Sequence, residues 1–185
     1  MNNPKILLES YKEKCNIENV PYFPINYEYL CEIIGVTLKQ QFDTKTVLGR
    51  YAVTPENMEI RIARSLEENH KRYVVTHMIA HLMMHLDFIL DNKFYTESIY
   101  PRSEEPYRTK ENEADSYTRE VLLPEKNVEK VSKDFVKKNS KNYSQPHELY
   151  EALVTHLAEY FGVDRNVVKR RVVEVGVVEF IGYSV

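Results

Sequence analysis

The sequence lacks the features that mark several classes of protein. Its only cysteines, Cys15 and Cys31, lie far apart and form no C-x-x-C pair. That spacing favours reduced thiols over a disulfide or a zinc site. No apolar run is long enough to span a bilayer. The first residues, Met1–Lys5, lack the apolar core of a secretory signal. We therefore expect a cytoplasmic protein without a membrane segment.

A net basic charge, internal repeats and low-complexity tracts are also missing. The formal net charge is −3, so no general positive field attracts nucleic acid, and direct nucleic-acid binding is not expected. The 185 residues are 43% hydrophobic and 29% charged, which is typical of a globular chain. The length predicts one domain of ordinary size with at most a small appended lobe.

The first half of the chain predicts an α+β fold. Apolar spacing and turn residues predict helices at residues 5–15, 27–34 and 71–90, and strands at 36–38, 49–53 and 58–62. In the last strand Met58, Ile60 and Ile62 alternate with charged residues, as in a sheet with one buried face. Apolar residues cover nearly the whole circumference of the 71–90 helix, which predicts a buried central helix.

The second half predicts a loop, a linker and further helices. Residues 91–110 are polar with two prolines, which indicates a long mobile loop. Helices are expected at residues 111–123, 148–161 and 166–174, and the polar segment 132–146 is the expected linker. We therefore predict a main domain over residues 1–130 and a C-terminal helical lobe over residues 145–185.

Three histidines, His77, His81 and His85, follow one another at four-residue steps on the buried helix and share one stripe. The first two have the spacing of the H-E-x-x-H zinc motif. They could instead be core histidines, but each buried imidazole then needs its own hydrogen-bond partner. A metal would satisfy His77 and His81 together. Glu113 is the candidate third ligand, although a solvated carboxylate at a helix start is the plainer interpretation.

Met78 stands where the H-E-x-x-H motif has its glutamate. That glutamate takes a proton from the metal-bound water, and a thioether cannot do so. Removing such a base costs about 10²–10⁴ in rate. We therefore assign no catalytic residue. Glu120, seven residues after Glu113, is a weak candidate for a displaced base, and Glu111 and Glu97 are also near in sequence.

Two segments carry a resemblance to a known family. Residues 72–85, RYVVTHMIAHLMMH, are similar to the pattern R-F-T-L-A-H-E-L-G-H-x-x-x-H. Residues 113–124, EADSYTREVLLP, are similar to E-A-N-x-F-A-x-x-L-L-M-P, and residues 157–177 also look alike. Both patterns occur in the ImmA/IrrE family of metallopeptidases. The resemblance covers the chain from roughly Gly35 onward.

The resemblance implies a zincin-like core, in which a small twisted sheet packs on the metal-site helix, followed by a C-terminal helical lobe. It implies zinc as the cofactor, with His77, His81 and Glu113 as ligands. His85 would line the same cleft without an assigned role. Members of the family cut helix-turn-helix repressors, often encoded beside them, and so switch on phage, mobile-element or stress genes. A repressor of this kind is therefore the expected partner.

Three functions follow. We favour a degenerate peptidase that engages a helix-turn-helix repressor and cuts it poorly or not at all. The alternative is an active zinc endopeptidase with a displaced base. The third is a DNA-binding regulator, because residues 148–174 resemble a helix-turn-helix with basic residues on or near its second helix, namely Arg165, Lys169, Arg170 and Arg171. For that tail we favour a packing lobe with solvated basic residues.

Overall fold

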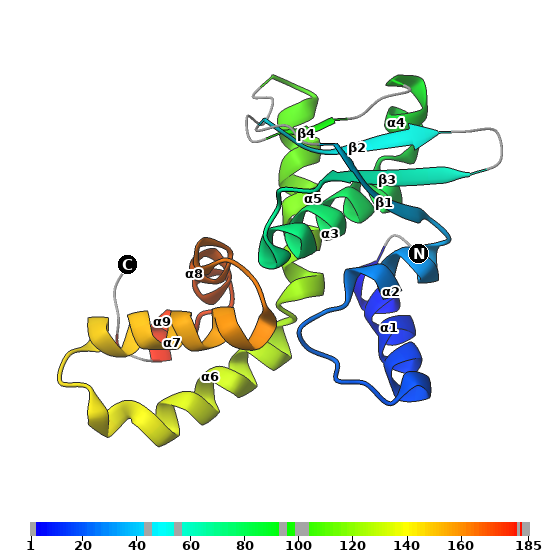
Figure 1. Cartoon of the computed structure of the whole chain (residues 1–185). Coiled ribbons are helices and arrows are strands. Elements are labelled where there is room, and N and C mark those ends of the chain that lie inside the picture. The colour runs from blue at the N-terminus through cyan, green and yellow to red at the C-terminus, as the bar shows by residue number, and fades with distance from the viewer. Residues whose placement is uncertain are drawn as a thin grey trace.

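The computed structural model describes residues 3–42, 46–53, 57–92, 96–98, 104–180 and 182. It is an α+β fold in which a small sheet lies at one end of the molecule and most of the helices lie to one side of it (Figure 1). In chain order the elements are α1 (Pro4–Glu18), α2 (Tyr27–Ile34), β1 (Thr37–Phe42), β2 (Val47–Val53), β3 (Met58–Ala63), α3 (Glu68–Met84), α4 (Leu86–Asn92), β4 (Thr96–Ser98), α5 (Tyr107–Leu122), α6 (Glu125–Asn139), the 3-10 turn η1 (Ser140–Asn142), α7 (Pro146–Phe161), α8 (Arg165–Glu174) and α9 (Val177–Phe180).

The sheet has four strands in the order β1-β3-β2-β4. The pair β1–β3 is parallel, and the pairs β3–β2 and β2–β4 are antiparallel. In β3, Ile60 and Ile62 are fully buried, whereas Glu59 forms ion pairs with Lys39 and Arg61. The apolar face predicted for this strand is thus buried at Ile60 and Ile62, but Glu59 on the other face is buried as well, so burial does not alternate along β3. The apolar side chains of the sheet join the core that also contains α3.

Helix α3 is the buried central helix that the apolar pattern predicts, since every residue from Val74 to Leu82 is buried. The prediction of one helix over residues 71–90 is wrong at its end. His85 leaves the helical conformation, with φ −131° and ψ 33°, and separates α3 from α4. The helix therefore stops at the last histidine of the stripe.

Two segments differ from the sequence prediction. The polar segment 132–146 is mostly helical, because α6 continues to Asn139 with Val128 and Ser132 on its buried side. Its role as a boundary between two domains stays a prediction. Within the expected loop 91–110, Thr96–Ser98 form strand β4 and α5 already begins at Tyr107. Residues 93–95 and 99–103 of that loop lie outside the described residues, and its mobility stays a prediction.

The C-terminal helices pack on the rest of the chain. Val168 and Val172 of α8 are fully buried and belong to the same hydrophobic core as α3. The Arg171 guanidinium donates a hydrogen bond of 2.9 Å from Nε to the carbonyl oxygen of Leu123, at the end of α5. Arg72 of α3 donates to the carbonyl oxygen of Gly162, which closes α7 with φ 62°. These contacts join α8 to the end of α5 and the end of α7 to α3, the helix that carries the histidines.

Both cysteine thiols are buried and free. Burial raises the pKa of the Cys31 thiol to about 12, so this thiol stays protonated and inert at neutral pH. Among the described residues, no helix has the length and apolar character needed to cross a membrane.

Candidate metal centre

The predicted stripe of histidines faces α5. His77 and His81 approach each other through Nε2, with 3.0 Å between the two nitrogens. His81 and His85 approach each other through Nδ1, with 3.1 Å between them. Tyr73 lies one turn before His77 and stacks on its ring. All three histidines are buried, on a helix whose residues from Val74 to Leu82 are otherwise apolar except for Thr76.

The third member of the cluster is Glu111, from the second turn of α5. Its Oε2 lies 3.1 Å from Nε2 of His77 and 3.5 Å from Nε2 of His81. The ligand atoms of these three residues all lie within 4.8 Å of one another. Zinc bonds of about 2.0–2.1 Å in a tetrahedron place neighbouring ligand atoms about 3.3 Å apart. The observed separations of 3.0–3.5 Å fit that geometry.

Glu113, the predicted third ligand, lies elsewhere. Its Oε2 is 2.8 Å from Nε2 of His85, and it is not part of the three-residue cluster. Residues two apart on a helix point in different directions, so Glu111 and Glu113 cannot occupy the same position. The structure thus brings Glu111, and not Glu113, to His77 and His81. Which carboxylate binds a metal stays a prediction, and the geometry favours Glu111.

The outward nitrogens of the two histidines also have partners. Nδ1 of His77 lies 3.2 Å from Oδ1 of Asp115, which accepts a 2.5 Å hydrogen bond from the Tyr73 hydroxyl. Nδ1 of His81 faces His85, which in turn contacts Glu113. Metal-binding histidines are commonly oriented in this way, by a partner on the ring nitrogen that does not bind the metal. His85 and Glu113 therefore fit an orienting role.

Sequence reasoning missed Asp115 and Tyr73 and considered Glu111 only as a spare acid. A usable signal was present. Glu111 and Asp115 are four residues apart on α5, as His77 and His81 are on α3, so both pairs project from one helix face. Two such faces packed together bring four polar side chains to one point.

Burial and neighbouring charge set the protonation of the cluster. Burial lowers the pKa of His81 to about 4, because desolvation disfavours the imidazolium more than Glu111 favours it. Burial by itself raises the pKa of the Glu111 carboxyl. Hydrogen bonds from His77 and His81 outweigh this effect and lower the pKa of Glu111 to about 2. A neutral imidazole and an ionised carboxylate are the forms that bind a metal.

Met78 faces the sheet. Its side chain is fully buried, and a Cβ placed on Gly49 of β2 would lie 2.3 Å from the Met78 Sδ. The Tyr51 hydroxyl donates a hydrogen bond to the backbone carbonyl of Met78. The position next to His77 is therefore filled by a thioether that packs closely under a strand.

Two other acids named from the sequence are Glu120 and Glu97, and the structure describes the side chain of Glu120. Glu120 contacts Arg171, and its nine-residue separation from Glu111 corresponds to about 14 Å along α5. Its position gives no support to a displaced base, which stays a prediction. The backbone of Glu97 belongs to β4, but its side chain lies outside the described residues.

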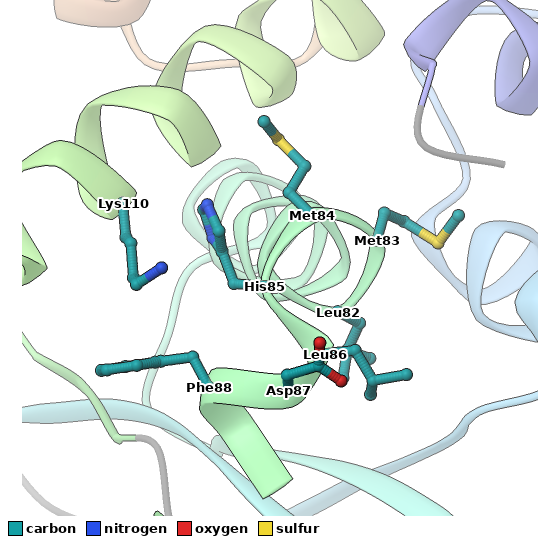
Figure 2. Close-up of a pocket in the computed structure, with 8 residues that line it drawn as sticks. All are labelled: Leu82, Met83, Met84, His85, Leu86, Asp87, Phe88 and Lys110. Carbon is teal, nitrogen blue, oxygen red and sulfur yellow. The ribbon is translucent and has the colours of Figure 1, made fainter. Parts of the chain in front are cut away.

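Hollows flank both ends of the histidine stripe. Figure 2 shows the one at the His85 end, where His85 and Lys110 project into the space between α3, α4 and α5. It has a volume of about 480 Å³ and a mixed wall, in which apolar residues such as Leu82, Met84 and Phe88 stand beside the charged Asp87 and Lys110. At the other end, a cavity of about 200 Å³ is lined by Tyr73, Arg119, Asn166, Val167 and Arg170.

Two histidines and one glutamate form a donor set known from catalytic zinc sites, which keep a further position for water or substrate. A family model described as the IrrE N-terminal-like domain, of the M78 peptidases, matches residues 31–173. No curated protein gave a significant match to the sequence. The matched segment contains the sheet, the histidine stripe, Glu111 and most of the C-terminal lobe. The chain therefore belongs to the IrrE N-terminal-like family of M78 metallopeptidases.

Proposed function

We propose that the protein binds zinc through His77, His81 and Glu111 and engages a helix-turn-helix repressor, with proteolysis lost or strongly impaired. The observation that carries this proposal is the contrast at one turn of α3. The donor set for a metal is assembled, whereas the adjoining position of the general base holds Met78. In this view the protein regulates by binding its partner.

The residues of the chain would divide the work as follows. His77 and His81 offer Nε2 to the metal, and Glu111 offers a carboxylate oxygen. Asp115 and His85 hold the two imidazoles in place from their Nδ1 sides. A bound zinc would lower the pKa of its water and polarise a carbonyl group. The thioether of Met78 cannot take the proton from that water.

The partner assignment rests on membership of the family and on the resemblance to ImmA/IrrE proteins, whose members act on helix-turn-helix repressors. The hollows at both ends of the histidine stripe add support. Tyr73 and His85 are twelve residues apart on α3, which corresponds to about 18 Å. An extended segment of about five or six residues spans that length. The site therefore suits a stretch of polypeptide better than a small molecule.

Neither competing function has a specific observation in its favour. Each carboxylate that α5 presents to the histidines already contacts one of them, which leaves none of these acids in the place of a displaced base. For DNA binding, Arg165 and Lys169 both pair with Glu151, and Arg171 is buried. Arg170 is the most exposed of the four basic residues named from the sequence, with 71% of its side chain accessible against 43% for Arg165.

The test is a gain of function. The zinc-loaded protein is incubated with the helix-turn-helix repressor encoded beside its gene, and both binding and cleavage are followed. We expect the wild type to bind with little or no cleavage, and Met78→Glu to cleave about 10²–10⁴-fold faster. Lys71→Glu is the matched control, because it adds the same acid to the same helix at a position that is not among the residues lining either hollow.

One further variant and two measurements on every variant protect the interpretation. Met78→Glu combined with His81→Asn should lose the gained cleavage, since the metal site is then incomplete. Metal content and thermal stability of each variant show whether it has folded. Efficient cleavage by the wild type at catalytic concentrations would refute the proposal and support the displaced base. Failure of the wild type to bind the repressor would refute the partner.

A further inference from the structure

The cavity at the Tyr73 end of the stripe has an unusual wall. Two arginines from different helices line it, Arg119 of α5 and Arg170 of α8, together with the amide of Asn166. Among the described residues, no carboxylate is part of the lining of this cavity. The neighbouring hollow of about 540 Å³ shares Tyr73, Asn166 and Val167 with it and adds Arg165 and Lys169 against a single acid, Asp164.

Hydrogen-bond donors remain available on both arginines. Arg119 pairs with Glu174 at 2.8 Å, yet its Nε is buried and has no hydrogen-bond partner among the described residues. Arg170 approaches Asp115 only at 3.9 Å, which exceeds hydrogen-bonding distance, and its side chain is mostly exposed. A guanidinium has five donors arranged to hold a carboxylate by two bonds. A carboxylate entering the cavity would satisfy donors that the folded chain leaves unused.

The cavity adjoins the metal centre. Tyr73, which forms part of its wall, donates a hydrogen bond to Asp115, and Asp115 contacts Nδ1 of His77. Both Arg119 and Arg170 approach the second oxygen of the same Asp115 at 3.9 Å. From Tyr73 to the midpoint of His77 and His81 is about 9 Å along α3, the length of two or three extended residues.

We propose that this cavity is a recognition site for the carboxylate of an aspartate or glutamate in the partner protein. The acidic residue would lie two or three positions from the residue that faces the metal centre, on the side of the C-terminal lobe. The inference rests on the proposed function in so far as the carboxylate belongs to a bound polypeptide. It adds a specificity determinant, Arg170, and gives the C-terminal lobe a part in choosing the partner.

The cavity is tested directly with a small probe. The ¹⁵N-labelled, zinc-loaded full chain is titrated with N-acetyl-glutamate amide, and the Nε–Hε signals of Arg119 and Arg170 are followed. The uncharged N-acetyl-glutamine amide is the matched ligand. We expect saturable shifts at millimolar concentration with the glutamate compound only. Arg170→Gln should weaken this binding about tenfold, and Arg108→Gln, an exposed arginine of α5 outside the cavity, should leave it unchanged.

Several outcomes would overturn the inference. They are equal shifts with both compounds, equal binding by wild type and Arg170→Gln, and a similar loss in Arg108→Gln, which would indicate a general charge effect. Binding of a labelled 20-base-pair DNA duplex at low salt that Arg170→Gln abolishes would assign Arg170 to phosphate instead. A repressor that fails to bind while the glutamate compound still shifts Arg170 would refute the proposed function and leave the carboxylate site in place.

Discussion

The two sides of α3 that meet at His77 and Met78 have opposite characters, although the two residues are neighbours in sequence. The side that faces α5 collects His77, His81, Glu111 and Asp115 into a cluster in which each polar group has a partner. The side that faces the sheet is apolar, and Met78 packs under Gly49 there. A helix that is buried all round can therefore present two histidines of a cluster that could hold a metal ion directly beside an apolar face that begins at the next residue.

The largest expected effect is the difference in zinc affinity between Glu111→Gln and Glu113→Gln. Replacing a metal ligand removes more binding than replacing an orienting partner, whose loss typically costs 10–100-fold in affinity. We expect Glu111→Gln to weaken zinc binding by more than about 100-fold and Glu113→Gln by about tenfold or less. Competition titration with a zinc chelator measures both. A larger loss in Glu113→Gln would show that the ligand predicted from the sequence is the correct one.

The second prediction concerns the pH dependence of folding stability in the metal-free protein. This dependence should come from the polar side of α3 and not from the side that faces the sheet. The unfolded chain protonates His81 near pH 6.5, whereas the folded protein does so only near pH 4. The unfolded state thus binds more protons in this interval, and stability falls as the pH falls. Glu111 extends the loss from about pH 4.5 towards pH 2, because its folded-state pKa is lowered.

We expect the free energy of unfolding to fall by on the order of 1–3 kcal/mol between pH 7 and pH 4. Urea unfolding in the presence of a chelator measures it. His81→Gln should make the free energy of unfolding depend less steeply on pH in this range. Met78→Leu, on the sheet side, should leave the pH dependence unchanged. If His81→Gln showed the same pH dependence of stability as the wild type, groups other than His81 would cause the acid sensitivity.

The smallest effect tests the packing of Met78 under β2. In Gly49→Ala the new methyl group meets the Met78 Sδ, which can move because it is near the end of a flexible side chain. We expect a loss of about 1 kcal/mol in the free energy of unfolding. In a Met78→Ala background the same substitution should be neutral or stabilising, because it fills space that the thioether has vacated. Urea unfolding of the wild type, the two single variants and the double variant gives the coupling free energy between the two substitutions. Additive effects would show that the two residues are not in contact.

Much of the fold and part of the site were predictable. The buried helix, the buried apolar face of β3 and the end of α2 at Gly35 all follow from local periodicity and local backbone preference. The break at His85 and the helical state of residues 132–139 were not foreseen. A polar stretch remains helical when its few apolar residues, such as Phe135 and Val136, find a surface to pack against, and that surface comes from other helices.

The sequence by itself determined that two histidines share one face of a buried helix and that Met78 takes the place of the base, because a four-residue step and a residue type are properties of the chain alone. Only the tertiary structure decided which carboxylate completes the cluster. The choice between Glu111 and Glu113 depends on how α5 is rotated against α3, and that rotation is set by the packing of their apolar faces. The same packing joins Arg119 to Arg170 beside the centre, across a separation of fifty-one residues in the chain.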